Sequence, residues 1–303
     1  MLPEANQDVR VKLACETILK EKISSIIVFG KPEEFSPIFH NNSMCKIIDI
    51  ENDENLSSFA TQLYEMRKAK GLSQAEAQEL VKQPTYFSMM LLKNNMADGV
   101  VAGAKYSTAD VLRPGLQIIK TKPGKKSVTG GMLMIKKGCR PLFFSDVSLI
   151  PQPTSEELAE IAIASAEFMQ KVVEVEPKVA MLSFSTKGSA KHDMVDKVQQ
   201  ATSIAQSRCS FVIDGEMQAD SALDLATSQK KGITSSVGGN ANVLIFPDLD
   251  AGNIGYKLVA RLAGYEAIGP IMLNFNKPIN DLSRGCTKQG IINTVIITKL
   301  LVE

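Results

Sequence analysis

The sequence predicts an α/β protein in which short strands alternate with helices around mainly parallel sheets. In the second half of the chain, apolar or β-branched runs of strand length are followed by longer helical patterns, and the connections are short. The composition, 44% hydrophobic and 22% charged, supplies ample residues for packed cores. The strands expected from this alternation are residues 179–184, 211–213 and 241–246, and the helices that follow them are residues 190–205, 220–230 and 251–262.

The first half of the chain carries the same two patterns less regularly. Ser73 with Glu76, and Thr154 with Glu157, have the spacing of a capping box, and each pair is expected to open a helix. Further helices are expected at residues 7–19 and 55–70. Strands are expected at residues 24–29, 45–50, 97–104, 131–135 and 141–144, and the last two of these should pair across a turn. Residues 121–127 are rich in Lys, Gly and Pro and are expected to form a linker.

Length, charge and cysteine usage narrow the classes of protein. The 303 residues allow one large or two medium domains, and a net charge of +1 gives no basic field for nucleic acid. No apolar run is long enough to cross a bilayer, and the first residues lack the pattern of a secretory signal. Five scattered cysteines without a C-x-x-C pair argue against disulfides and zinc, and His40 and His192 leave little material for a metal site. We therefore expect a cytoplasmic protein without a metal.

A polar stretch near the C-terminus has the composition of an anion site. Residues 269–286 read GPIMLNFNKPINDLSRGC, and their glycines and prolines predict an irregular segment, neither helix nor strand, ahead of an apolar helix at 291–301. Ser283 and Arg284 would place a hydroxyl and a guanidinium beside backbone N–H groups. The alternative is a polar turn between two core elements. The residues alone favour the anion site and the polar turn equally.

A second segment of this kind follows the strand expected at residues 97–104. Ser107 and Thr108 come directly after it, and Arg113 lies about one helical turn further on. A helix start with hydroxyls and an arginine can hold an anion. Taken by itself, this segment fits better with a simple N-cap and a surface arginine.

Three more loops are expected at strand ends in the second half. Residues 185–189, STKGS, lack the spacing of a phosphate-binding loop. Asp214-Gly215-Glu216 could supply a base or a metal ligand but is more typical of a turn. The acidic residues 247–253 are expected to cap the helix that follows them.

The longer motifs of the chain resemble those of one enzyme family. They are MLSFSTKGSA at residues 181–190, DGEMQAD at 214–220, NVLIFPDLDAGNIGYK at 242–257, YSTADVLRPGLQ at 106–117, the opening LPEANQDVRV, and the stretch ending in KPINDLSRGC. These motifs, and the order in which they occur, resemble those of phosphate acetyltransferase, of the phosphate acetyl/butyryltransferase family. The resemblance extends from residue 2 to about residue 300.

The resemblance implies a reversible transfer of acetyl between CoA and inorganic phosphate, with CoA as a substrate, no cofactor and no metal. It also implies a homodimer of two-domain subunits, with a fold like isocitrate and isopropylmalate dehydrogenases and an active site in the interdomain cleft. The first α/β domain would contain residues 1–122 and 270–303, and the second residues 123–269.

The family pattern also implies roles for individual residues. Arg113 and Arg284 would hold phosphate or the acetyl-phosphate oxyanion, and Ser283 would stabilise the tetrahedral transition state. Ser107 and Thr108 would line the same pocket. Arg67 would meet the 3′-phosphate of CoA, although a solvated helix face is the competing interpretation.

The sequence departs from the family pattern at two places. The position where the family carries an aspartate, assigned as the base that deprotonates CoA, is Gly290, which follows Lys288 and Gln289. This departure leaves a weakly active or non-catalytic CoA-binding homologue as an alternative, and phosphate butyryltransferase as another. The second departure is that the LPEA motif directly follows Met1, whereas the family has a helix and a strand before this motif. A core edge strand is therefore expected to be shortened.

Overall fold

The structure is a computed structural model that describes residues 1–302. It divides into two compact units: unit 1 contains Met1–Pro123 and the chain from Phe275 onward, and unit 2 is Gly124–Asn274. The passage into unit 2 lies within the expected linker at residues 121–127. The chain returns at Phe275 rather than near residue 269, because strand β9 (Glu266–Leu273) continues in the sheet of unit 2.

Unit 1 is built around two parallel strand pairs, β1 with β2 and β3 with β10. Leu2 forms a parallel bridge to Val28, and the N–H of Val101 donates to the carbonyl of Met1 at 2.9 Å, so the first residues lie between the two pairs. The strands are β1 (Ile26–Phe29), β2 (Cys45–Ile48), β3 (Val100–Ala102) and β10 (Ile279–Asp281).

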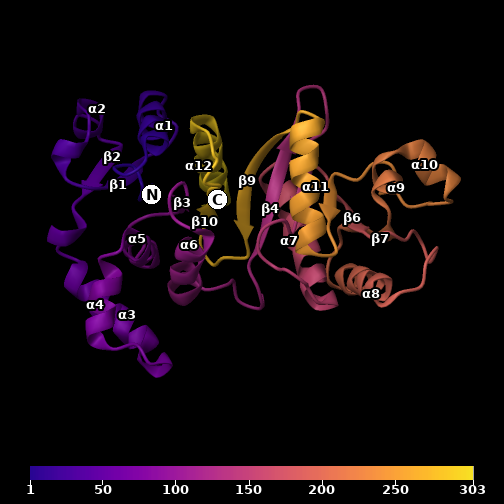
Figure 1. The fold of residues 1–303 in the computed structure, drawn as a ribbon, viewed down its shortest axis with the longest axis horizontal. Coiled ribbons are helices and arrows are strands. Elements are labelled where there is room, and N and C mark those ends of the chain that lie inside the picture. The colour runs from indigo at the N-terminus through magenta and orange to yellow at the C-terminus, as the bar shows by residue number, and fades with distance from the viewer. Residues whose placement is uncertain (303) are drawn as a thin grey trace. The chain divides into compact units, whose positions relative to one another are not determined.

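Helices from both ends of the chain complete the core of unit 1. Helices α1 and α12 pack together, as Figure 1 shows, and their apolar faces join Leu2 and Leu282 in one buried cluster. The helices are α1 (Val9–Lys20), α2 (Pro37–His40), α3 (Leu56–Arg67), α4 (Gln74–Val81), α5 (Pro84–Lys93), α6 (Thr108–Pro114) and α12 (Lys288–Val302). Short helical turns are η1 (Pro32–Glu34), η2 (Ile50–Asn52), η3 (Lys68–Lys70) and the π-helical η4 (Gly115–Ile119).

Unit 2 contains one six-stranded sheet in the order β7-β6-β8-β5-β4-β9 (Figure 1). The first four strands are parallel to one another, whereas β4 is antiparallel to both β5 and β9. The predicted mainly parallel α/β alternation and the predicted antiparallel turn between residues 131–135 and 141–144 are confirmed. The remaining strands are β4 (Thr129–Ile135), β5 (Leu142–Ser145), β6 (Lys178–Leu182), β7 (Val212–Met217) and β8 (Val243–Ile245).

Helices cover both faces of this sheet. Successive side chains of a strand point to opposite faces. Phe143 packs on Phe168 of α7 at 4.7 Å between ring centroids, whereas Phe144 belongs to the cluster that packs against α11. These two helices therefore lie on opposite faces. The helices of unit 2 are α7 (Ser155–Lys171), α8 (Asp193–Arg208), α9 (Ala219–Leu223), α10 (Leu225–Lys230) and α11 (Leu249–Leu262).

The prediction that Asp214-Gly215-Glu216 forms a loop after a strand is wrong, because all three residues lie inside β7. The buried carboxylate of Glu216 accepts the N–H of Gly188 at 2.7 Å, and Asp214 forms an ion pair with Lys187. Both carboxylates thus bind the loop that follows the neighbouring strand β6. These contacts satisfy the acidic side chains within the sheet, which allows the strand to continue through them.

The prediction that residues 269–286 contain no regular structure is also wrong. The stretch includes the end of β9 and all of β10. Gly269 and Pro270 interrupt the pairing of β9 with β4 at a register shift between Gly131 and Leu133. Because β9 is an edge strand, a proline that lacks an N–H is tolerated at this irregularity. Among residues 1–302, no helix combines the length and apolar character that crossing a membrane requires.

Candidate active site

Two polar loops leave neighbouring parallel strands at one edge in unit 1. Strand β3 pairs with β10, and the N–H of Leu282 donates to the carbonyl of Ala102 at 2.6 Å. We call residues 103–107 the β3 loop and residues 282–287 the β10 loop. The carboxyl ends of parallel strands meet at the same edge, which is where α/β folds bind ligands. The two predicted anion segments therefore come together from positions far apart in the sequence.

A buried carboxylate holds the backbone of the β3 loop. Glu4 is 1% exposed, and its Oε2 accepts the N–H groups of Gly103 and Ala104 at 2.8 and 3.0 Å. Its Oε1 accepts those of Lys105 and Tyr106 at 2.6 and 2.9 Å. Removing a carboxylate from water is costly unless donors replace the water, and here four donors do so. Glu4 thus fixes the chain immediately before α6.

One arginine ties the β10 loop to the β3 loop. Arg10 donates from Nη1 to the carbonyls of Arg284 and Cys286 at 2.8 and 3.0 Å, and from Nη2 to the carbonyl of Ala104 at 3.0 Å. Its partner is Asp8, the N-cap of α1, at 2.7 Å. Hydrogen bonding from Arg10 lowers the pKa of Asp8 below its usual value. The carbonyls of both loops are therefore held by one fixed guanidinium.

The start of α6 supplies two hydroxyl groups with different partners. Ser107 is the N-cap: its Oγ accepts the N–H of Asp110 at 3.3 Å and donates to the carboxylate of Asp110 at 2.6 Å. The interpretation of Ser107 as a helix cap is thus confirmed. Thr108, one residue further, donates from Oγ1 to Oδ2 of Asp281 at 2.7 Å, which joins α6 to the end of β10.

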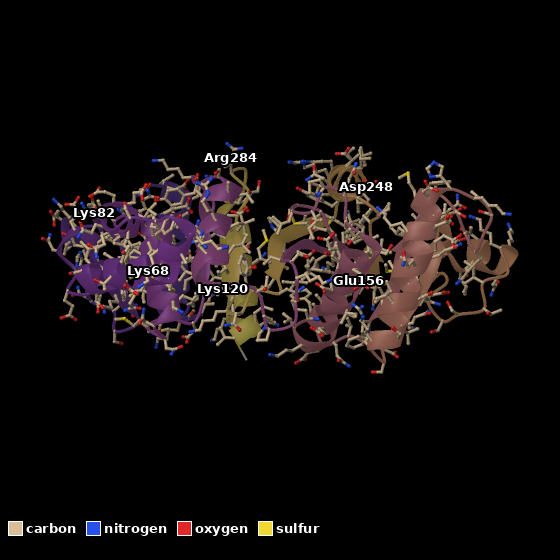
Figure 2. The ribbon with its side chains drawn as sticks, turned by 90° about the horizontal axis from the view of Figure 1, so that it is seen from below. Lys68, Lys82, Lys120, Glu156, Asp248 and Arg284 are labelled. Carbon is tan, nitrogen blue, oxygen red and sulfur yellow. The ribbon has the colours of Figure 1, made fainter. Side chains whose placement is uncertain are left out.

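Ser283 and Arg284 stand at the exposed part of the β10 loop. The N–H of Cys286 donates to the carbonyl of Ser283 at 2.8 Å, which closes a tight turn. The Ser283 Oγ accepts the N–H of Gly285 at 3.3 Å, so its own proton can be donated to a ligand. Figure 2 shows the Arg284 side chain projecting outward from the ribbon of unit 1.

None of the three predicted arginines, Arg67, Arg113 and Arg284, forms an ion pair within the described part of the chain. The charge of Arg113 nevertheless contributes to the lowered pKa of Asp110. Burial raises the pKa of Tyr86, while the charges of Arg113 and Arg67 act on the same phenol in the opposite direction. Arg67 and Arg113 therefore share the surroundings of Tyr86. A guanidinium that forms no ion pair can bind phosphate oxygens.

The first turn of α12 contains the position of the expected base. Gly290 is half-buried, and its N–H donates to Oγ1 of Thr287 at 3.0 Å. A Cβ at this position would meet the same Oγ1 at 3.4 Å, so a side chain fits with little displacement. Lys288 and Gln289, the two residues before Gly290 in the same turn, are exposed. No carboxylate stands among these residues.

Glu4, Arg10 and Asp281 hold the two loops and the start of α6 through hydrogen bonds, and sequence reasoning gave none of them a role in the site. Glu4 and Arg10 belong to the opening motif LPEANQDVR, which carries part of the family resemblance and many polar residues ahead of a helix, but no sign of which side chains hold the loops. Asp281 stands two residues before Ser283. Among residues 1–302, no three His, Cys, Asp or Glu side chains are grouped in a way that could hold a metal ion.

Comparison with known proteins places the chain in a family. The model of the phosphate acetyl/butaryl transferase family matches residues 1–299, and the chain belongs to this family. The phosphate acetyltransferase of Clostridium acetobutylicum is 47% identical over 302 residues, covering 96% of this chain and 91% of that protein. The phosphate acetyltransferase of Bacillus subtilis is 41% identical over 296 residues, covering 96% and 91%. The resemblance seen in the motifs is confirmed.

Solved structures agree with these relatives. A phosphotransacetylase from Streptococcus pyogenes has a TM-score of 0.92 and 40% identity, covering 99% of this chain and 92% of that one. A branched-chain phosphotransacylase from Enterococcus faecalis shares the fold, with a TM-score of 0.75 at 17% identity. The likeness to isocitrate and isopropylmalate dehydrogenases and the interdomain position of the site stay predictions.

Proposed function

We propose that the protein is a phosphate acetyltransferase that interconverts acetyl-CoA plus phosphate with acetyl phosphate plus CoA. The observation that carries the proposal is 43–47% identity to proteins named phosphate acetyltransferase, over 96–98% of this chain and 91–93% of those proteins. The alternative of a non-catalytic homologue and that of a butyryltransferase gain no support from these relatives. CoA is a substrate in this proposal, and no cofactor takes part.

The unpaired guanidinium groups suit the charges of this reaction. Phosphate attacks the thioester carbonyl of acetyl-CoA, and negative charge develops on the carbonyl oxygen of a tetrahedral transition state. Arg113 and Arg284 would neutralise the phosphate, and the Ser283 hydroxyl would donate to the developing oxyanion. Thr108 and Ser107 would line the pocket, and Arg67 would bind the 3′-phosphate of CoA.

A coupled assay tests the proposed reaction. Thioester formation from acetyl phosphate and CoA, followed with the purified protein, should proceed well above the rate of the Arg284→Ala variant. A wild-type rate equal to that of Arg284→Ala would sink the enzyme proposal. Substituting butyryl phosphate for acetyl phosphate in the same assay should lower kcat/KM. A higher kcat/KM with butyryl phosphate would identify the protein as a phosphate butyryltransferase instead.

Introducing a carboxylate at Gly290 should raise the rate of thioester formation. The CoA thiol, with a pKa of about 8.5, must lose a proton before attack, and a positioned base contributes about 10²–10⁴-fold. We expect Gly290→Asp to increase kcat by about tenfold or more near neutral pH. The measurement is the initial rate of thioester formation across pH 6–9.

The matched control for this variant is Gly290→Asn, which has the same shape without the charge. Both variants remove a glycine from the first turn of α12 and should stabilise that helix by about 0.5 kcal/mol. A gain in rate shared by Asn and Asp would assign the effect to helix order. An unchanged or lower rate with Asp would show that the base lies elsewhere.

An apolar stripe on α11 supports a homodimer. Ile254, Leu258 and Leu262 are spaced four residues apart, on one helix face, and are 57%, 52% and 82% exposed. The opposite face of α11 packs on the sheet of unit 2 through Tyr256 and Val259. We propose that the stripe is covered by the same helix of a second copy, since an interface related by a two-fold axis is self-complementary.

Charge placed in this stripe should prevent association. The wild-type protein is expected to sediment as a dimer, and Leu258→Asp as a monomer, because an unpaired carboxylate would be buried at the interface. Leu225→Asp is the matched control: Leu225 is 51% exposed, on α10, away from the stripe. A monomeric wild type would reject the dimer, and a dimeric Leu258→Asp would reject this face.

The proposed setting is acetate metabolism in the cytoplasm. All five cysteines are free thiols in the structure, and burial raises the pKa values of three of them, Cys15, Cys45 and Cys286. Reduced cysteines of this kind are typical of a reducing compartment. Fractionation of cells that contain the protein would test the assignment.

A further inference from the structure

The reaction needs a proton acceptor, and most carboxylates near the two loops are already occupied. Glu4 accepts four backbone N–H groups through both of its oxygens. Asp8 caps α1 and pairs with Arg10, and Asp110 accepts from Ser107. Hydrogen bonds lower the pKa values of Asp8 and Asp110 below their usual range, which makes them weaker bases.

Asp281 differs from these carboxylates in its bonding. It is 2% exposed, and its Oδ2 accepts from Oγ1 of Thr108 at 2.7 Å. Its Oδ1 is buried and has no hydrogen-bond partner within residues 1–302. An unsatisfied buried carboxylate oxygen costs free energy and favours uptake of a proton. Asp281 therefore has an unused position for a proton beside the anion-binding loops.

Thr108 connects this buried carboxylate to the surface of the site. It is an exposed residue at the first position of α6, directly after the Ser107 cap, and its hydroxyl faces Asp281. A hydroxyl can donate one proton while it accepts another. The arrangement is therefore a two-member path from the outside of the β3 loop to Asp281.

We propose that Thr108 and Asp281 form a proton relay that deprotonates the thiol of CoA, an inference that rests on the proposed acetyl transfer. The CoA thiol gives its proton to Oγ1 of Thr108 as Thr108 passes its own proton to Asp281. The thiolate attacks the carbonyl carbon of acetyl phosphate, the C–S bond forms, and the C–O bond to phosphate breaks. In the reverse direction the thiolate leaves and receives the proton back along the same path.

The electrostatic surroundings of Asp281 fit an acceptor that works near neutral pH. Its pKa is raised to about 6, chiefly by burial; the negative charge of Glu4 acts in the same direction, whereas the Thr108 hydroxyl and the backbone of Leu282 oppose the rise. Glu4 is the one charged group within residues 1–302 whose effect on Asp281 is resolved. A base with such a pKa is ionised at pH 7 and holds a proton more readily than an ordinary aspartate.

Three variants test the relay in the thioester-forming assay. Asp281→Asn keeps the acceptor for the Thr108 hydroxyl but cannot take up a proton, and Thr108→Val removes the hydroxyl at similar size. Each should lower kcat by about 10²–10⁴ at pH 7, and the double variant should lose no more than the larger single loss. Thr108→Ser, which retains the hydroxyl, should recover most of the rate lost in Thr108→Val.

The pH dependence separates a relay from a purely structural role. Wild-type kcat should fall as the pH drops through about 6, because the acceptor becomes protonated. The ratio of wild-type to Asp281→Asn rates cancels titration of the substrates. This ratio should become smaller above about pH 8.5, because the CoA thiol there ionises without a base from the protein. Gly290→Asp should rescue Asp281→Asn more than it accelerates the wild type.

A ratio that stays constant from pH 6 to 9 would overturn the relay and leave Asp281 as a structural residue. Strictly additive losses in the double variant would also overturn it. Thermal unfolding of Asp281→Asn checks the fold, and we expect no loss of stability because a neutral amide replaces a buried carboxylate. If the wild type itself is inactive, the proposed function fails; if it is active with unchanged variants, only the relay fails.

Discussion

Replacing Arg284 with alanine is expected to lower kcat for thioester formation by about 10²–10³, the usual cost of removing one preorganised donor to the reacting group. The guanidinium is exposed and has no ion pair within residues 1–302, so its charge is available to the substrate. KM for acetyl phosphate should rise more than KM for CoA. Arg284→Lys should be intermediate, because it keeps the charge and loses the planar fork.

The fold should survive this substitution. What anchors the residue is its backbone carbonyl, which Arg10 holds at 2.8 Å, and alanine retains that carbonyl. The matched control is Arg208→Ala, which removes an exposed arginine of unit 2 that pairs with Glu156. An exposed pair of this kind contributes little, so activity and melting temperature should both be unchanged. Equal activity of Arg284→Ala and Arg208→Ala would remove Arg284 from the site.

Local patterns predicted the strands and the loops that carry the site. Ser107 and Thr108 follow a short buried strand, and Ser283 and Arg284 precede an apolar helix, so their place at element ends was visible in the sequence. The pairing of β3 with β10 joins residues more than 170 positions apart and has no local signal. Family resemblance, rather than periodicity, supplied the expectation that these segments act together.

The errors came from residues whose partners are distant. Asp214 and Glu216 have turn-like composition, but Lys187 and Gly188 from the next loop satisfy them, and β7 continues. Pro270 suggested an irregular segment, but an edge strand at a register shift accommodates it. Local propensity describes what a segment favours alone, and tertiary contacts decided both of these cases.

Glu4 and Arg10 were missed for the same reason. Their side chains bind backbone atoms 94 to 276 positions away, and backbone partners leave no trace in residue identity. An opening LPEANQDVR marks polar residues but does not say which of them become buried. The energetic importance of Glu4 is therefore visible only in the structure.

Replacing Glu4 with glutamine should destabilise unit 1 by about 3 kcal/mol. The carboxylate receives four N–H donors from the β3 loop, and hydrogen bonds to a charged acceptor contribute about 1.5–3 kcal/mol each. Glutamine keeps one oxygen and turns an NH₂ group toward the other two donors, which are then buried without an acceptor. The measurement is urea unfolding together with hydrogen exchange of the amides at residues 103–106.

Those four amides should exchange about 10²-fold faster in Glu4→Gln, which corresponds to the expected loss in free energy. Glu33→Gln is the matched control, because Glu33 is exposed in η1 and its substitution should change stability by less than about 0.5 kcal/mol. The Glu4→Gln substitution should also change the pH dependence of catalysis. Removing the charge of Glu4 removes one cause of the raised pKa of Asp281, so the acid limb of kcat should move to lower pH. Unchanged exchange at residues 103–106 would mean that other contacts hold the loop. Faster exchange together with an unchanged acid limb of kcat would mean that Glu4 holds the loop but does not influence the pKa of the proton acceptor.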